Sequence, residues 1–125
     1  MIVGIGIDLC EVERMARELG KSGGGFRDRV FTEEEVQYCQ GKRYASQHFA
    51  ARYAAKEAFF KALGIGLREG LAWKDVEVRN DPQGKPSLKL IGKAELMIEQ
   101  RAVRNVHLSL THTRQNAVAV VILES

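Results

Sequence analysis

Strand-like and helix-like patterns alternate along the 125-residue chain. Apolar residues recur with a period of two over residues 2–8, which indicates a β-strand, and a helix should follow to about Leu19 before a flexible glycine-rich stretch. Further along the chain, periodicity and turn residues predict a helix from Thr32, a long helix at about 46–63, a hairpin of strands 75–79 and 87–91, a short helix at about 92–102, and strands at 106–112 and 117–123. This order indicates one α+β domain over residues 1–125, with a mainly antiparallel sheet and helices packed on one face.

The long helix, residues 46–63, distributes its charges in an unusual way. At 100° per residue, Glu57 and Lys61 share a stripe with alanines, Arg52 and Lys56 share a second stripe, and aromatic residues cover much of the remaining surface. Charges set among alanines and aromatics are partly desolvated, which is costly unless a partner or ligand uses them. The helix is therefore a candidate active-site element. An ordinary surface ion pair between Glu57 and Lys61 is the alternative.

Two carboxylates are predicted to meet where the first strand packs on this helix. The strand face that carries Asp8 otherwise carries only Gly4 and Gly6, and the helix stripe around Glu57 is otherwise rich in alanine. Small residues on both surfaces permit close backbone approach, so both carboxylates could reach one ion. Two carboxylates without histidine or thiolate suit a hard cation such as Mg²⁺, with phosphate oxygens as further ligands. Alternatively, or in addition, Asp8 caps a helix that begins at Leu9.

Basic residues near these carboxylates suit a ligand that carries phosphates. Lys61 lies one helical turn beyond the helix carboxylate and would face phosphates held by the metal. Arg52 and Lys56 could bind further phosphate oxygens, arginine through its planar fork and lysine as a point charge. Gly64 and Gly66 would let the backbone approach a ligand closely, although glycines after a helix are more often a simple C-cap.

Two other polar surfaces are candidates for binding. Alternation puts His107 and Thr111 on one face of the strand at 106–112, which could bind a polar ligand or be the wet side of an edge strand. The first helix places Arg14, Arg17 and Lys21 on one basic face. Acidic residues share that helix, so an ordinary solvated face is an equally good interpretation of the basic residues.

Composition narrows the class of protein. The chain is 45% hydrophobic and 28% charged, which is typical of a soluble globular domain, and its net charge is only +3. A nucleic-acid reader would show more positive charge with aromatics among the basic residues, so we expect no nucleic-acid partner. Residues 1–9 lack a basic leader and contain Asp8, so we expect no signal peptide and no membrane span. Cys10 and Cys39 have neither metal-site nor disulfide spacing, so we expect a reducing, cytoplasmic location.

Five segments occur in the order and spacing of a known family: Gly4–Arg14, Phe31–Glu35, Arg52–Ala62, Gly84–Pro86 and Ser109–His112. Together they resemble the bacterial holo-acyl-carrier-protein synthases, which are small 4'-phosphopantetheinyl transferases. The resemblance covers most of the chain, and its central motif combined with Asp8 is specific. The chain departs from the family at Ile65, where threonine is common, and at Asn116, where many members carry an aromatic residue.

The resemblance implies that the chain transfers 4'-phosphopantetheine from coenzyme A to a serine of apo acyl carrier protein. Adenosine 3',5'-bisphosphate would be released, and the reaction would support fatty acid biosynthesis. The acceptor could instead be a polyketide or peptide-synthase carrier domain. Asp8 and Glu57 become Mg²⁺ ligands, and Lys61 stabilises the developing charge. The serine proton would go either to Glu57 or to a water on the metal.

The same resemblance implies the binding residues and the assembly. Coenzyme A would be bound by Arg52, Lys56, Lys61, Gly64, Gly66, Pro86, His107 and Thr111. The family's homotrimer, with active sites between subunits, would bring His107 and Thr111 to a coenzyme bound mainly by a neighbour. The basic face of the first helix would dock an acidic acyl carrier protein in a salt-sensitive way. From another class, a small basic binding module without catalysis is the alternative, and the paired carboxylates count against it.

Overall fold

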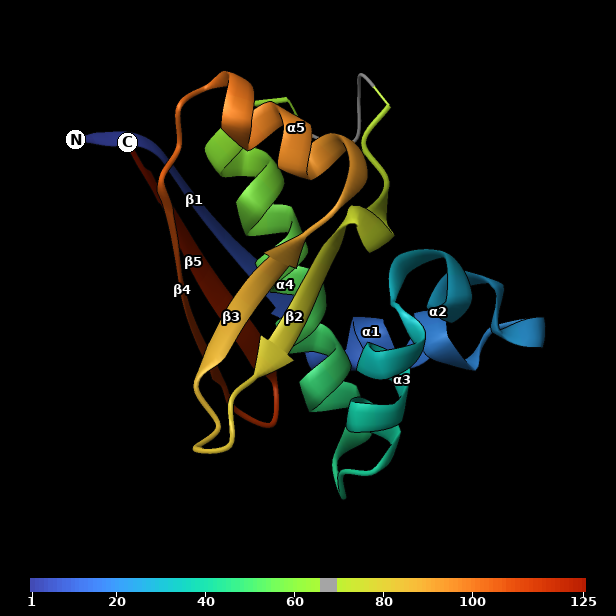
Figure 1. The fold of residues 1–125 in the computed structure, drawn as a ribbon. Helices are drawn as coiled ribbons and strands as arrows, with labels where there is room; N and C mark the ends of the chain where they lie inside the picture. Colours follow the sequence, from blue (N-terminus) through green and yellow to red (C-terminus); the bar gives the residue numbers. More distant parts are fainter. Residues whose placement is uncertain (66–69) are drawn as a thin grey trace.

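A long central helix packed between two antiparallel sheets defines the architecture (Figure 1). The computed structural model describes residues 1–65 and 70–125. The elements in chain order are β1 (Ile2–Glu11), α1 (Val12–Gly20), η1 (Ser22–Gly24), α2 (Gly25–Val30), α3 (Glu33–Gln40), α4 (Ala45–Leu63), η2 (Trp73–Asp75), β2 (Val76–Asn80), β3 (Pro86–Leu90), α5 (Gly92–Gln100), β4 (Asn105–His112) and β5 (Asn116–Glu124). The single α+β domain with a long central helix is confirmed.

The strands form two separate sheets among the described residues, where the sequence predicted one. One sheet has the order β1-β5-β4, and the other is the β2–β3 hairpin alone. Helix α4 contacts both sheets, with the hairpin in front of it and the three-stranded sheet behind it in Figure 1. This position explains why α4 lacks a broad wet face, because it is covered on nearly all sides. None of the described helices is long and apolar enough to cross a membrane.

The backbones of β1 and α4 touch directly. A Cβ atom built on Gly6 would lie 1.8 Å from the carbonyl oxygen of Ala58, and one on Gly4 would lie 2.3 Å from the carbonyl oxygen of Ala62. Real Cβ atoms do not approach oxygen so closely, so only glycine fits at these two positions. The close approach predicted from small residues on both surfaces is confirmed.

Strand β1 is longer than the alternation over residues 2–8 indicated. Its antiparallel pairing with β5 continues past Asp8, through Leu9 opposite Val118, to Glu11 opposite Asn116. Helix α1 therefore begins only at Val12, and its N-cap residue is Glu11. The interpretation of Asp8 as a helix cap is wrong, because Asp8 lies inside the strand on the face turned towards α4.

The glycine-rich stretch after α1, which was expected to be flexible, forms a sharp turn. Gly23 and Gly24 adopt positive φ angles of 79° and 68°, which turn the chain sharply. A short helix, α2, follows directly over Gly25–Val30. Gly23 and Gly24 thus form the turn that leads from α1 into α2.

We expect Gly6→Ala to destabilise the fold, because the added methyl group would collide with the backbone of α4. The loss of unfolding free energy should reach at least about 2 kcal/mol, as for overpacked cores. Urea unfolding followed by circular dichroism measures it. Gly20→Ala is the matched control, since nothing lies within 4 Å of the added atom at the end of α1. Equal stability of the two variants would contradict the close packing.

Candidate active site

A cavity of about 390 Å³ lies at the junction of β1, α1, α2 and α4. Asp8 enters it from β1 and Glu57 enters it from α4, so the packing of these two elements brings the two carboxylates to one space. The complete lining is Asp8, Leu9, Cys10, Glu11, Arg14, Met15, Glu18, Phe26, Arg29, Tyr53 and Glu57.

Lys61 forms its ion pair with the strand carboxylate. Its Nζ lies 3.0 Å from Asp8 Oδ1, and it donates a hydrogen bond to the carbonyl oxygen of Ile7 at 3.2 Å. The alternative pairing with Glu57 on a wet helix stripe is not the arrangement found. The Lys61 side chain remains 56% exposed while that of Asp8 is 15% exposed, so the ammonium group stays open to a ligand arriving from solvent.

The environment of Glu57 disfavours its negative charge. Burial raises the pKa of this carboxyl, and the charge of Asp8 adds to the effect, while a hydrogen bond from Tyr53 and the charge of Lys61 act in the opposite direction. The positive charge around these two neighbouring carboxylates does not fully neutralise them. A divalent cation between them would supply that charge, so the residues present fit a metal.

The donor set also indicates which metal would fit. Within residues 1–65 and 70–125, no group of three histidine, cysteine, aspartate or glutamate side chains could hold an ion. The protein would therefore supply only two carboxylates, with water and ligand oxygens completing the shell. This is the usual coordination of Mg²⁺ at phosphate-handling sites.

Tyr53 is a residue of the cavity that the sequence interpretation overlooked. Its ring stacks on Trp73 with centroids 5.1 Å apart and an interplanar angle of 26°. Its hydroxyl is hydrogen-bonded to Glu57, and burial raises the pKa of the tyrosine. The i, i+4 spacing of Tyr53 and Glu57 was the available signal. Arg29 was missed because no helix was predicted over Gly25–Val30.

Arg52 and Lys56 point away from this cavity, into the interior. The Arg52 guanidinium lies 4.0 Å above the Tyr38 ring, and its Nη2 donates to Asn80 Oδ1 at 2.7 Å. Only 3% of Arg52 is exposed, and within the described part of the chain its Nε has no hydrogen-bond partner. Arg52 is thus held beside the hairpin, with its buried Nε–H unpaired among the described residues.

Lys56 is fully buried, and its ammonium group is saturated. Its Nζ donates to Glu35 Oε1 at 2.7 Å and to the carbonyl oxygens of Val76 at 2.6 Å and Trp73 at 3.1 Å. An ammonium has three protons, so none remains for a phosphate. A direct phosphate contact from Lys56 does not fit these contacts, which leaves the supporting role that the sequence also allowed.

Two of the residues predicted to contact the coenzyme, Gly64 and Pro86, lie at the end of α4 and at the start of β3. Gly64 ends α4 with φ 80°, and its N–H bonds to the carbonyl oxygens of Phe60 and Lys61, so its visible role is a C-cap. Gly66 lies outside the described residues. Pro86 begins β3 opposite Asn80, which places it close to the hairpin residue that binds Arg52.

His107 and Thr111 do not reach the cavity within one chain. They lie on the face of β4 turned away from α4, and β5 separates β4 from β1. His107 Nε2 lies 3.0 Å from Glu124 Oε1 on the neighbouring strand. One subunit therefore does not bring these residues together with Asp8 and Glu57.

The basic residues of α1 lie beside the cavity. Arg14 lines it, whereas Arg17 and Lys21 make exposed ion pairs with Glu13 at 3.4 Å and Glu18 at 3.2 Å. Helix α1 ends at Gly20, so Lys21 is its C-cap residue and not part of the helical face. The predicted basic surface is present next to the carboxylates, with two of its three charges partly neutralised.

A family model described as the 4'-phosphopantetheinyl transferase superfamily matches residues 4–121. The chain belongs to this superfamily. Among its relatives, a holo-[acyl-carrier-protein] synthase from Geobacter sp. (strain M21) is 48% identical over 124 residues and is matched over 99% of each chain. Within the superfamily the chain therefore stands with the holo-acyl-carrier-protein synthases, which confirms the enzyme class that the sequence predicted.

Solved structures of such synthases share the fold. The enzyme from Bacillus anthracis, crystallised in complex with CoA (3',5'-ADP), is 40% identical and has a TM-score of 0.82 over 100% of this chain and 98% of its own. The enzyme from Neisseria meningitidis is 32% identical and has a TM-score of 0.90 over the full length of both chains.

In this member of the transferase superfamily, the central helical motif divides its charges between two environments. Glu57 lines the cavity formed with β1, and Lys61 pairs with Asp8 beside it. Arg52 and Lys56 face the β2–β3 hairpin and α3. The motif therefore combines a set of residues open to ligands with a second set that holds the helix in place.

Proposed function

We propose that the chain transfers the 4'-phosphopantetheine group of coenzyme A to a serine of apo acyl carrier protein. The reaction depends on Mg²⁺, releases adenosine 3',5'-bisphosphate and supports fatty acid biosynthesis in the cytoplasm. The observation that carries the proposal is the meeting of Asp8 and Glu57 in one cavity beside Lys61. The relatives with coenzyme-containing structures support the choice of substrate.

The proposed reaction requires that the reacting groups be held in position and that the charge on the phosphates and the leaving oxygen be stabilised. The serine oxygen attacks the phosphorus that bears the pantetheine, the bond from this phosphorus to the bridging oxygen breaks, and the leaving bisphosphate carries the electron pair. Mg²⁺ held by Asp8 and Glu57 would neutralise pyrophosphate charge when bound. The exposed ammonium of Lys61 is placed to stabilise charge that develops on the leaving oxygen.

The proton of the serine needs an acceptor. Glu57 is the carboxylate of the cavity whose pKa burial raises, which improves its match to that task. The hydrogen bond between Tyr53 and Glu57 would keep the carboxylate oriented. Water is the second candidate acceptor.

Coenzyme binding is proposed to involve the residues outside the cavity as well. Arg52 would support this binding by holding the hairpin whose end carries Pro86. Gly64 and Gly66 could contact the coenzyme through their backbone. Lys56 would act only by holding the helix.

Incubation with coenzyme A, Mg²⁺ and apo acyl carrier protein tests the function directly. The carrier should gain about 340 Da by mass spectrometry, as expected for one covalent phosphopantetheine on serine. Asp8→Asn and Glu57→Gln should each abolish the gain while leaving the circular dichroism spectrum intact, because each removes a charged metal ligand.

Glu99→Gln, which neutralises an exposed carboxylate on α5, is the control and should be fully active. Full activity of either site variant would contradict the metal assignment. An unmodified carrier with the wild-type enzyme would contradict the function, and faster modification of a polyketide or peptide-synthase carrier would change the natural acceptor.

The basic surface of α1 is proposed to dock the acidic carrier protein, because Arg14 borders the cavity where the serine must enter. The double variant Arg14→Glu and Arg17→Glu should raise the KM for the carrier by about 10-fold or more, with a weaker salt dependence, and should leave the KM for coenzyme A nearly unchanged. Steady-state kinetics at low and high salt measure both constants. Lys93→Glu on α5 is the control, and an equal rise of both KM values in the double variant would contradict docking.

A homotrimer is proposed because the outer face of the three-stranded sheet is apolar and uncovered by the described residues. Ile5, Ile7 and Leu9 are 61%, 58% and 58% exposed, and they lie next to valine and isoleucine of β5 on the same face. Continuous apolar surface of this kind marks an interface. His107 and Thr111 share this face, so assembly would bring them towards a coenzyme bound by a neighbour.

The double variant Ile5→Lys and Ile7→Lys should convert the trimer to monomer and remove transferase activity, because charges cannot be buried at the interface. Analytical ultracentrifugation measures the mass. Leu96→Lys, at a 44% exposed position on α5, is the control and should remain trimeric. A wild-type monomer with full activity would contradict the assembly.

A further inference from the structure

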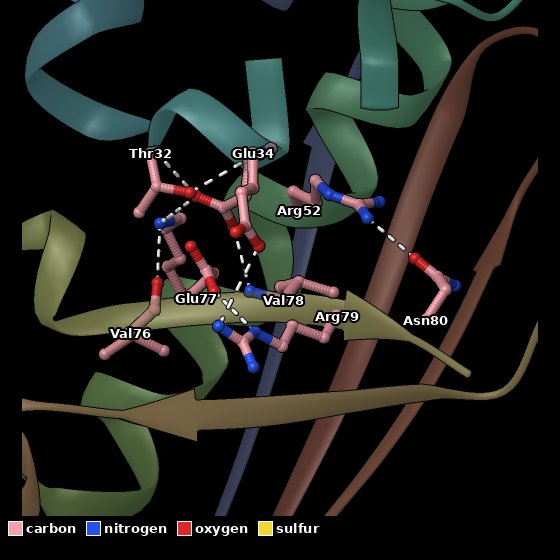
Figure 2. Close-up of polar contacts among 10 residues, drawn as sticks. Thr32, Glu34, Arg52, Val76, Glu77, Val78, Arg79 and Asn80 are labelled. Carbon is pink, nitrogen blue, oxygen red and sulfur yellow. Dashed lines mark hydrogen bonds and ion pairs between the residues drawn. The ribbon is translucent and has the colours of Figure 1, made fainter. Parts of the chain in front are cut away.

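A buried carboxylate outside the cavity joins three segments that are distant in the sequence. Glu35 Oε1 accepts hydrogen bonds from the backbone N–H of Thr32 at 2.9 Å and from Lys56 Nζ at 2.7 Å. Its Oε2 accepts from the backbone N–H of Val78 at 2.8 Å. In Figure 2, Thr32 lies above Val76 and Val78 of β2, with the bonds drawn across the space between α3 and the hairpin. Glu35 thus binds α3, α4 and β2 together.

The Glu35–Lys56 pair is costly to bury and is completely satisfied. Both side chains are fully shielded from solvent, at 0% exposure. Burial lowers the pKa of Lys56, while the charge of Glu35 acts against that effect. Apolar residues of similar size often stabilise a core as well as a buried ion pair does, so such a pair is better explained by the arrangement that it specifies.

The arrangement that it specifies is the rotation of α4. Lys56 immediately precedes Glu57, so fixing Lys56 against β2 directs Glu57 about 100° away around the helix, into the cavity. Arg52, one turn earlier on the same stripe, is bonded to Asn80 at the other end of β2, as Figure 2 shows. Two anchors at the two ends of one strand fix both the rotation of the helix and its position along its axis.

A second connection runs through Trp73. Its carbonyl oxygen accepts a hydrogen bond from Lys56, and its ring stacks on Tyr53. Tyr53 in turn is hydrogen-bonded to Glu57. The ammonium of Lys56 therefore holds the residue that supports the tyrosine beside the catalytic carboxylate.

We propose that Glu35 is a positioning residue, which through Lys56 sets the rotation of α4 and so the direction of Glu57 into the cavity and of Lys61 towards Asp8. The proposal rests on the function proposed above. Glu35 does not line the cavity, and its hydrogen bond to α4 is the one with Lys56.

Glu35→Gln tests this role, because the amide keeps the shape of the carboxylate and removes its charge. At a temperature where circular dichroism shows every variant folded, kcat should fall by about 10-fold or more, because small displacements of the reacting groups lower the reaction rate strongly. The KM for coenzyme A should change much less. Mg²⁺ affinity, measured by calorimetry with coenzyme A present, should weaken by about 10-fold, as for lost supports of metal ligands.

Met97→Ala on α5 is the matched control. It removes a buried side chain, at 5% exposure, from a helix that makes neither of the two anchoring bonds of α4, and should lower the melting temperature by creating a cavity. Its kcat and its Mg²⁺ affinity should remain those of the wild type. An equal loss of kcat in Glu35→Gln and Met97→Ala at matched stability would overturn the positioning role.

Lys56→Met provides an independent variant that keeps the aliphatic stem and should reproduce the losses of kcat and metal affinity. If a single variant fails to fold, the double variant Glu35→Gln and Lys56→Met, which removes both buried charges, replaces it in the same comparison. Wild-type kcat and metal affinity in the folded variants would overturn the proposal. Failure of the wild-type enzyme to modify any carrier would instead overturn the proposed function, and the calorimetry would still report whether the pair orients the two carboxylates.

Discussion

The direct contact between the backbones of β1 and α4 is the constraint on which the site depends. Gly4 and Gly6 leave no room for side chains against the carbonyl oxygens of α4. The close approach of β1 to α4 lets Asp8, at the next position on the same strand face, share a cavity with Glu57. Larger residues at the two glycines would move the strand away and separate the carboxylates. The geometry of the proposed metal site is therefore a consequence of backbone packing.

The charged residues of helix α4 serve two purposes. Glu57 lines the cavity and Lys61 pairs with Asp8 beside it. Arg52 and Lys56 bind the hairpin on another side of the helix. A helix buried on nearly all sides could slide or rotate if apolar contacts alone held it, because such contacts are non-directional. Hydrogen-bonded charges give it one orientation. The residues proposed to act in catalysis and those that anchor the helix are thus neighbours in one motif.

The sequence was sufficient to predict the fold class, the long helix, the hairpin and the meeting of Asp8 with Glu57, since each depends on local periodicity or on residue size. It did not predict the partners of Lys56, because Glu35 lies 21 positions away and two other acceptors are backbone carbonyls. The capping box formed by Thr32 and Glu35 was recognisable in the sequence. The second use of the Glu35 carboxylate, as the partner of Lys56, was not. The true length of β1 was hidden too, because pairing with β5 and not local pattern sets it.

The central claim is that β1 and α4 create one metal site from Asp8 and Glu57. Crystals grown with coenzyme A and Mn²⁺, a substitute for Mg²⁺ with a measurable anomalous signal, test it most directly. The account predicts an anomalous peak between the two carboxylates, bridged to the pyrophosphate, with Lys61 beside the phosphates. A peak bound to other residues, or Glu57 turned away from the metal in a crystal of active enzyme, would contradict it.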